Sequence, residues 1–148
     1  MEYVTLNNGI KMPKLGYGVY QTPPEDTKRY MLDAIDVGYR SIDTAQAYYN
    51  EEGVGAALAK SGLPREEFFL TTKVWITNAG YEKAKASIEE SLRRLRTDYL
   101  DLLLIHQPFG DYYGTGLWRS STTPGSCAPS ACPISAPTAI GISSTSPR

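Results

Sequence analysis

Four polar side chains that could take part in acid–base chemistry lie at or just beyond the ends of apolar, strand-like stretches: Asp43, Tyr48, Lys73 and His106. Asp43 is near the end of the first stretch and Tyr48 follows it, whereas Lys73 and His106 lie at the ends of the next two. A β/α barrel gathers residues from the carboxyl ends of its strands into one pocket. We therefore expect these four side chains to meet there, although they are far apart in the sequence.

A tyrosine, a lysine, a carboxylate and a histidine in one pocket would form a proton-donating site. A free tyrosine is a weak acid at neutral pH, and a neighbouring ammonium makes it a better donor because it favours the phenolate. Lys73 can supply that ammonium, Asp43 can pair with it, and His106, the only histidine, can hydrogen-bond a carbonyl oxygen. Such a pocket would polarise a carbonyl and protonate the resulting alkoxide, while a hydride donor must supply the rest of the reaction.

Each of these residues also has an ordinary structural interpretation when it is taken alone. A lysine at a strand end is commonly a solvated charge, and a tyrosine such as Tyr48 is commonly a packing residue. His106 alone could be a hydrogen-bonded core histidine, and Asp43 alone could cap a helix or pair with a cation. Their shared position at the ends of successive strands favours the functional interpretation, since barrel enzymes place their chemistry there.

The elements that must position these residues alternate between strands and helices. A hairpin is predicted at residues 3–14, with Asn8-Gly9 as its turn. The apolar patterns then predict strands at 15–19, 39–44, 68–75 and 99–106, and helices at about 22–38, 51–60 and 81–95. Thr22 is the expected N-cap of the first of these helices.

This order predicts an α/β fold with parallel strands and right-handed helical crossovers. A doubly wound sheet and a barrel both fit the alternation. The first half of a (β/α)8 barrel, preceded by a β-hairpin, is favoured because the polar residues fall at successive strand ends and not at one switch point. Gly16-Tyr17-Gly18 does not make a dinucleotide fingerprint, since neither a third glycine nor a helix follows directly.

The composition is that of a globular protein, with 41% hydrophobic residues, 21% charged residues and a net charge of −1. This balance gives no reason to expect nucleic acid or an anionic membrane as a partner. No apolar run approaches the roughly 20 residues that span a bilayer, and no secretory signal is visible at the start. We therefore expect a cytoplasmic protein with no obligate protein partner.

The last part of the chain differs from the rest. All 16 acidic residues precede residue 115, and the segment 116–148 contains both cysteines and five of the ten prolines. It has neither helical nor strand periodicity, so we expect a disordered, low-complexity tail. Cys127 and Cys132 lack a second Cys or His pair, so we expect incidental thiols and no metal site.

The body of the chain resembles the aldo-keto reductases. The resemblance rests on LGYGVYQ, DVGYRSIDTAQAYYNEEGVG, LTTKVW and RLRTDYLDLLLIHQP, which match that family in order, content and spacing from about residue 3 to 115. It implies a (β/α)8 barrel that reduces aldehydes and ketones, which are small-molecule carbonyl substrates, with NADPH. Within that family, the sequence most resembles small bacterial and fungal reductases of diketogluconate, glyoxal and methylglyoxal type.

The resemblance also implies a role for individual residues. Tyr48 would be the general acid, Lys73 and Asp43 would tune it, and His106 would orient the substrate carbonyl. The implied cofactor-binding residues are Val19, Tyr20, Gln21 and Asp43. The implied substrate-binding residues are Tyr20, Tyr48, Trp75 and His106.

The resemblance stops near residue 115, so we divide the chain into residues 1–115, half of a reductase barrel, and residues 116–148. One permitted codon choice for Thr115 to Arg119 encodes Trp-Ala-Met-Glu in another reading frame. Continued to about Pro137, that frame reads WAMEELYNAGKLRAIGVSNFSAD, which resembles the family's own continuation. We therefore expect an out-of-frame tail. The alternatives to a reductase are an inactive truncated fragment and a non-catalytic NADPH-binding or regulatory member of the same fold.

Overall fold

The computed structural model describes residues 1–107. Predictions that concern residues 108–148 lie outside the described residues, namely the disordered tail, the altered reading frame and the two thiols. The boundary between residues 115 and 116 also lies there and stays a prediction.

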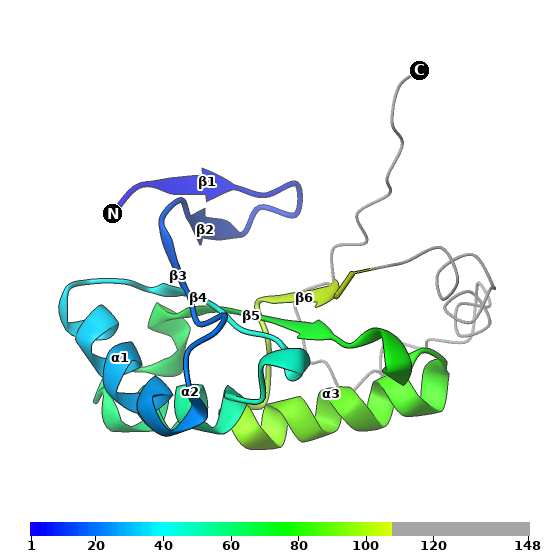
Figure 1. Ribbon diagram of the computed structural model, residues 1–148. Helices are drawn as coiled ribbons and strands as arrows, with labels where there is room; N and C mark the ends of the chain where they lie inside the picture. Colours follow the sequence, from blue (N-terminus) through cyan, green and yellow to red (C-terminus); the bar gives the residue numbers. More distant parts are fainter. Residues whose placement is uncertain (108–148) are drawn as a thin grey trace.

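Two sheets make up the β structure (Figure 1). Antiparallel strands β1 (Tyr3–Thr5) and β2 (Lys11–Pro13) form the predicted hairpin. A parallel sheet has the order β3-β4-β5-β6, with β3 (Gly16–Gly18), β4 (Ser41–Asp43), β5 (Phe69–Val74) and β6 (Leu102–Ile105). The strands are shorter than predicted, but backbone bonds from Val19 N to Asp43 O and from His106 N to Val74 O extend the ladder past their carboxyl ends.

Three helices, α1 (Pro24–Asp36), α2 (Glu51–Lys60) and α3 (Tyr81–Leu95), confirm the predicted helical segments. They lie together along one face of the parallel sheet, and the hairpin lies away from them (Figure 1). Short 3-10 turns, which the patterns did not predict, occur at η1 (Gln46–Tyr48), η2 (Arg65–Glu67) and η3 (Ile76–Asn78). The prediction that Thr22 caps α1 is wrong: Pro23 is the N-cap, and its fixed backbone angle suits a helix start without a side-chain bond.

Sequential strand order with all helices on one face is the arrangement of a barrel wall. A doubly wound sheet would instead place helices on both faces and reverse its strand order at a switch point. The described residues therefore form the first half of a (β/α)8 barrel preceded by a hairpin, as predicted.

The core lies between the sheet and the helices. Met31 of α1, Ile42 of β4, Leu70 of β5 and Leu95 of α3 are at most 1% exposed. A side chain at Gly55 of α2 would begin only 2.3 Å from the Arg94 carbonyl oxygen, so glycine allows the backbones of α2 and α3 to touch. This close packing fixes the connections that carry the polar residues.

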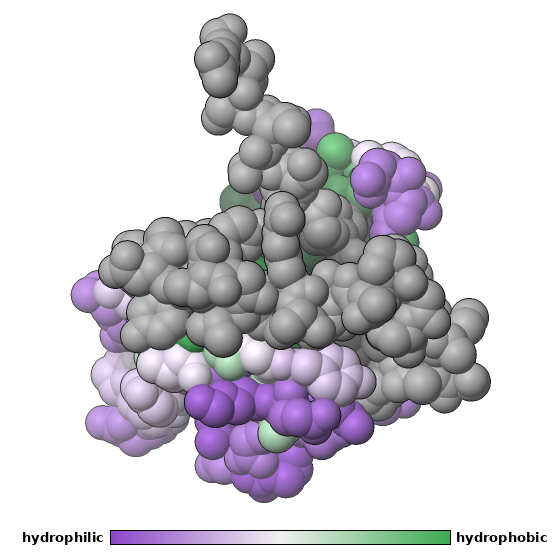
Figure 2. Space-filling model, turned by 90° about the vertical axis from the view of Figure 1, so that its right-hand side faces the viewer, coloured by the Kyte–Doolittle hydropathy of each residue, from purple (hydrophilic) through white to green (hydrophobic). Residues whose placement is uncertain are grey.

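The lower part of the surface in Figure 2, where the helical layer lies, is mainly hydrophilic. The polar outer faces of the helices fit a layer whose opposite side packs on the sheet. Within residues 1–107, no helix has the length and apolarity needed to cross a membrane.

Candidate active site

Lys73 is the centre of the polar cluster at the carboxyl end of the parallel sheet. Its Nζ donates to Asp43 Oδ1 at 2.5 Å, to the Thr44 carbonyl at 2.9 Å and to Tyr48 Oη at 3.4 Å. A lysine ammonium has three donors, so these contacts account for all of them. The Lys73 side chain is 13% exposed, and the ion pair with Asp43 holds it in this position.

The aromatic rings form a continuous row beside this ammonium. Tyr48 lies 5.0 Å from Tyr20 and 5.5 Å from His106, and His106 lies 5.2 Å from Trp75, all between ring centroids. These residues follow β4, β3, β6 and β5 respectively, so each comes from a different strand end. The structure thus brings together all four candidate catalytic residues. It also places beside them the two aromatic residues expected to line the substrate pocket, Tyr20 and Trp75.

His106 is held in the neutral form more readily than an ordinary histidine. Burial lowers the pKa of His106 below its usual value of 6.5, and the Lys73 charge lowers it further, while Asp43 opposes both effects. Its Nδ1 is buried and has no hydrogen-bond partner among residues 1–107.

We expect the single histidine of the 148-residue chain to titrate with a midpoint below 6.5 in an NMR pH series. Burial and the Lys73 charge both disfavour imidazolium, and His106 is the only imidazole, so the assignment is unambiguous. A midpoint at or above the ordinary value would contradict the enclosed position of the ring.

The predicted cofactor-binding stretch follows β3 directly. Val19 is fully buried in the core, so its side chain packs there, whereas Tyr20 is 66% exposed over Tyr48. Gln21 has a φ of 59°. Asp43, the fourth predicted cofactor residue, has a side chain that is 45% exposed beside Lys73.

Left-handed backbone conformations gather at this end of the sheet. Among residues 1–107, non-glycine residues with positive φ are Gln21, Tyr49, Arg96 and Gln107, and all but Arg96 follow a strand end at the polar cluster. Such conformations are costly outside glycine and tend to occur at functional sites.

Sequence reasoning missed three buried polar residues around Tyr48. Asn50, 1% exposed, donates to the carbonyls of Val19 and Thr22 and accepts from Thr44 Oγ1. It ties the β4 connection to the loop after β3. Gln46 and Glu51 make comparable ties to the β5 and α3 side. The available signal was the concentration of amide and carboxylate residues in a segment that also carries small apolar ones.

Glu51 is a carboxylate enclosed between α2, β5 and α3. It accepts from Thr72 Oγ1 at 2.8 Å and from Ser91 Oγ at 3.3 Å, and Arg94 lies 3.7 Å away. Burial raises the pKa of Glu51 above its usual 4.5, although the Thr72 and Ser91 bonds and the Arg94 charge oppose this shift.

We expect the free energy of unfolding of the unsubstituted chain to fall, relative to that of Glu51→Gln, as pH rises. Because the folded pKa of Glu51 is raised, the folded state binds more protons than the unfolded state between 4.5 and that raised value. The free energy of unfolding must therefore fall as pH rises through this window, and Gln cannot titrate. Urea unfolding from about pH 4 to pH 8 measures the difference. The exposed neighbour Glu52→Gln is the control, and a difference that stays constant with pH would contradict the expectation.

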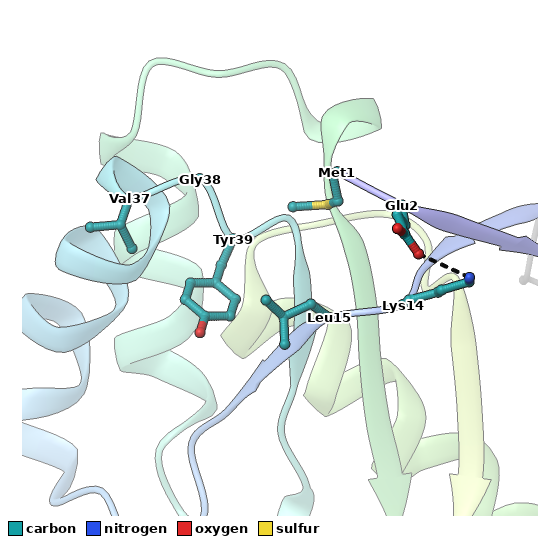
Figure 3. A pocket seen from close by; sticks show the side chains of 7 residues that line it. All are labelled: Met1, Glu2, Lys14, Leu15, Val37, Gly38 and Tyr39. Atoms are coloured by element: carbon teal, nitrogen blue, oxygen red, sulfur yellow. Dashed lines mark hydrogen bonds and ion pairs between the residues drawn. The ribbon is translucent and has the colours of Figure 1, made fainter.

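Among the cavities lined by residues 1–107, two lie away from the polar cluster. One, of about 770 Å³, is bordered by apolar side chains of Met1, Leu15, Val37 and Tyr39 and by the Glu2–Lys14 ion pair (Figure 3). The other, of about 450 Å³, lies between the hairpin and the amino ends of the strands. Neither is lined by Asp43, Tyr48, Lys73 or His106.

Comparison with known proteins decides the family. The sequence model of the Aldo/keto reductase family matches residues 7–134. The chain belongs to the aldo/keto reductase family. This membership confirms the resemblance noted from the motifs, and members of the family generally use NAD(P)H.

Individual relatives agree with this membership. An aldo-keto reductase of Mycolicibacterium smegmatis is 52% identical over 105 residues, which cover 71% of this chain and 38% of the relative. The glyoxal reductase of Bacillus subtilis is 49% identical over 118 residues, 79% of this chain and 42% of the relative. The chain thus spans about two-fifths of the length of these relatives.

Solved structures agree with the fold. An aldo/keto reductase from Brucella melitensis superposes with a TM-score of 0.73 at 45% identity, covering 80% of this chain and 46% of that one. An aldose reductase from Schistosoma japonicum gives a TM-score of 0.69 at 39% identity, covering 72% and 36%. The described residues therefore correspond to the first part of an aldo/keto reductase barrel.

Proposed function

We propose that this chain carries the proton-donating part of an NADPH-dependent reductase of aldehydes and ketones, with Tyr48 as general acid. The observation that supports this most directly is the contact between Lys73 Nζ and Tyr48 Oη, made while Lys73 also holds Asp43. A phenol that accepts a bond from an ammonium directs its own proton elsewhere, and the ammonium stabilises the charge that forms when that proton leaves.

In the proposed reaction, the substrate carbonyl oxygen lies between Tyr48 Oη and His106 Nε2. Neutral His106 donates a hydrogen bond that orients the carbonyl, and Tyr48 delivers its proton to the oxygen as negative charge develops there. Lys73 is a positioning residue that stabilises the phenolate left behind, and Asp43 fixes the ammonium. The proton comes from Tyr48 and returns to it from solvent.

The side chains of this site fit a nicotinamide cofactor in their chemistry. Tyrosine, lysine, aspartate and histidine can move protons, but none of them can donate a hydride, so carbonyl reduction here requires a separate donor. Tyr20, Gln21 and Asp43 would hold NADPH near its nicotinamide end, while Val19, which is fully buried, would support the loop that carries Tyr20 and Gln21. Bound there, NADPH would supply the hydride to the carbonyl carbon.

The substrate would be a small carbonyl compound held between aromatic walls. Tyr20 and Trp75 lie at opposite ends of the ring row that includes Tyr48 and His106. Aromatic walls exclude water and leave the carbonyl as the group that hydrogen-bonds.

A chimera tests this proposal. Residues 1–107 replace the corresponding segment of the Bacillus subtilis glyoxal reductase, which is 49% identical over the matched stretch. We expect saturable, carbonyl-dependent oxidation of NADPH, which is measured as the loss of NADPH absorbance. The unmodified relative is the positive control. Tight NADPH binding without turnover would instead identify a non-catalytic binding member of the fold.

A further inference from the structure

The side chain of Gln46 is a buried four-way junction that the proposed mechanism does not use. It is 8% exposed. Its Nε2 donates to the Ser87 carbonyl and to Ser91 Oγ, each at 3.1 Å, and its Oε1 accepts from Trp75 N and Asn78 Nδ2, each at 2.9 Å. A primary amide offers two donors and two acceptor positions, so every one is in use.

The partners fix the orientation of this amide. The Trp75 backbone N–H can only donate and the Ser87 carbonyl can only accept, so oxygen must face Trp75 and nitrogen must face α3. A flipped amide would leave both groups unpaired in a buried setting, at a cost of about 1–3 kcal/mol for each. The junction therefore has one stable arrangement.

Gln46 connects the turn of the proposed acid to the opposite wall of the proposed pocket. Gln46 and Tyr48 belong to the same single turn, η1, whereas Trp75 directly precedes η3 and Asn78 is the last residue of η3. Trp75 N lies just beyond the last residue of β5, where the strand ladder no longer supplies an acceptor. The Gln46 oxygen supplies it, and the Trp75 ring packs against His106 at 5.2 Å.

We propose that Gln46 is the positioning residue that sets the Trp75 wall against Tyr48 and His106, and so determines the width of the carbonyl pocket. This inference rests on the proposed function for its consequence, namely selection among carbonyl substituents. That Gln46 holds Trp75 in place against its neighbours does not depend on the proposed function. Small displacements of such a wall have large effects, since a misplacement of about 1 Å can cost roughly 100-fold in rate.

Asn50 provides a matched comparison on the other side of the same connection. It is also buried and makes three side-chain hydrogen bonds, but its two donor bonds hold Val19 and Thr22, not the Trp75 loop. A general loss of stability would affect variants of Gln46 and Asn50 alike. A specific positioning role would affect Trp75 only in variants of Gln46 and its partners.

The test uses the 148-residue chain with the other tryptophan replaced (Trp118→Phe), so that fluorescence reports Trp75 alone. Gln46→Met keeps the volume and removes all four bonds, and Asn78→Ala removes one of them at a half-buried site. Both are expected to increase quenching of Trp75 by acrylamide toward the value of the unfolded chain. Asn50→Ser is expected to leave this quenching unchanged.

The titration of His106 is the second measurement. When Trp75 moves away, water reaches the imidazole, so its NMR midpoint should rise in Gln46→Met and Asn78→Ala but not in Asn50→Ser. Unchanged quenching and midpoint in Gln46→Met would overturn the inference. Changes in Asn50→Ser equal to those in Asn78→Ala would also overturn it, even if Gln46→Met does not fold. Neither measurement needs turnover, so an inactive chimera would count against the proposed function and not against this role of Gln46.

Discussion

Replacing Tyr48 by Phe in the chimera is expected to reduce the rate of carbonyl reduction about 10²–10⁴-fold, the usual contribution of a positioned general acid. Phe keeps the ring that packs between Tyr20 and His106, so the aromatic row should remain in place. Only the hydroxyl that accepts from Lys73 is lost. NADPH affinity, measured by fluorescence titration, should therefore be unchanged.

Tyr49→Phe is the control for this substitution. It removes the same atom one residue further along, from a side chain that is 79% exposed and outside the aromatic row. We expect its rate to equal that of the unsubstituted chimera. Reduction by Tyr48→Phe that stays within about tenfold of that rate, a loss of only about 1.4 kcal/mol, would exclude Tyr48 as the acid.

Most of the fold was predictable from the sequence because its helices have strong, regular patterns. The helix predicted at residues 81–95 has those bounds in the structure, since its apolar residues recur at helical spacing and its start and end are clear. The choice of a barrel over a doubly wound sheet followed from where Asp43, Lys73 and His106 lie, and the strand order confirms it. The strands in the structure are shorter than the predicted strands. Beyond their carboxyl ends, only single backbone hydrogen bonds continue the pairing.

The positioning network was not predictable in the same way. Gln46, Asn50 and Glu51 look like ordinary loop and helix-start residues, and nothing local shows that they are buried once the chain has folded. Their partners lie between 6 and 45 residues away in the sequence. Periodicity reports which face of an element is buried, but it does not report which long-range partner a buried amide will meet.

Lys73→Met is expected to reduce carbonyl reduction in the chimera by roughly 100-fold or more, because the acid loses the charge that supports its proton transfer. Methionine keeps most of the apolar stem, so the substitution removes the ammonium and its bonds to Asp43, Thr44 and Tyr48. The exposed Lys60→Met on α2 is the control and should leave the rate unchanged.

The same substitution has an electrostatic effect that does not depend on turnover. The Lys73 charge lowers the pKa of His106, whereas Asp43 raises it. Without Lys73, the remaining carboxylate acts on the imidazole unopposed, so the His106 midpoint must rise toward its ordinary value, although burial still holds it down. An NMR pH series on the 148-residue chain measures this shift. A midpoint that does not move would mean that the ammonium does not act on His106, and an unchanged rate would remove Lys73 from the proton-transfer site.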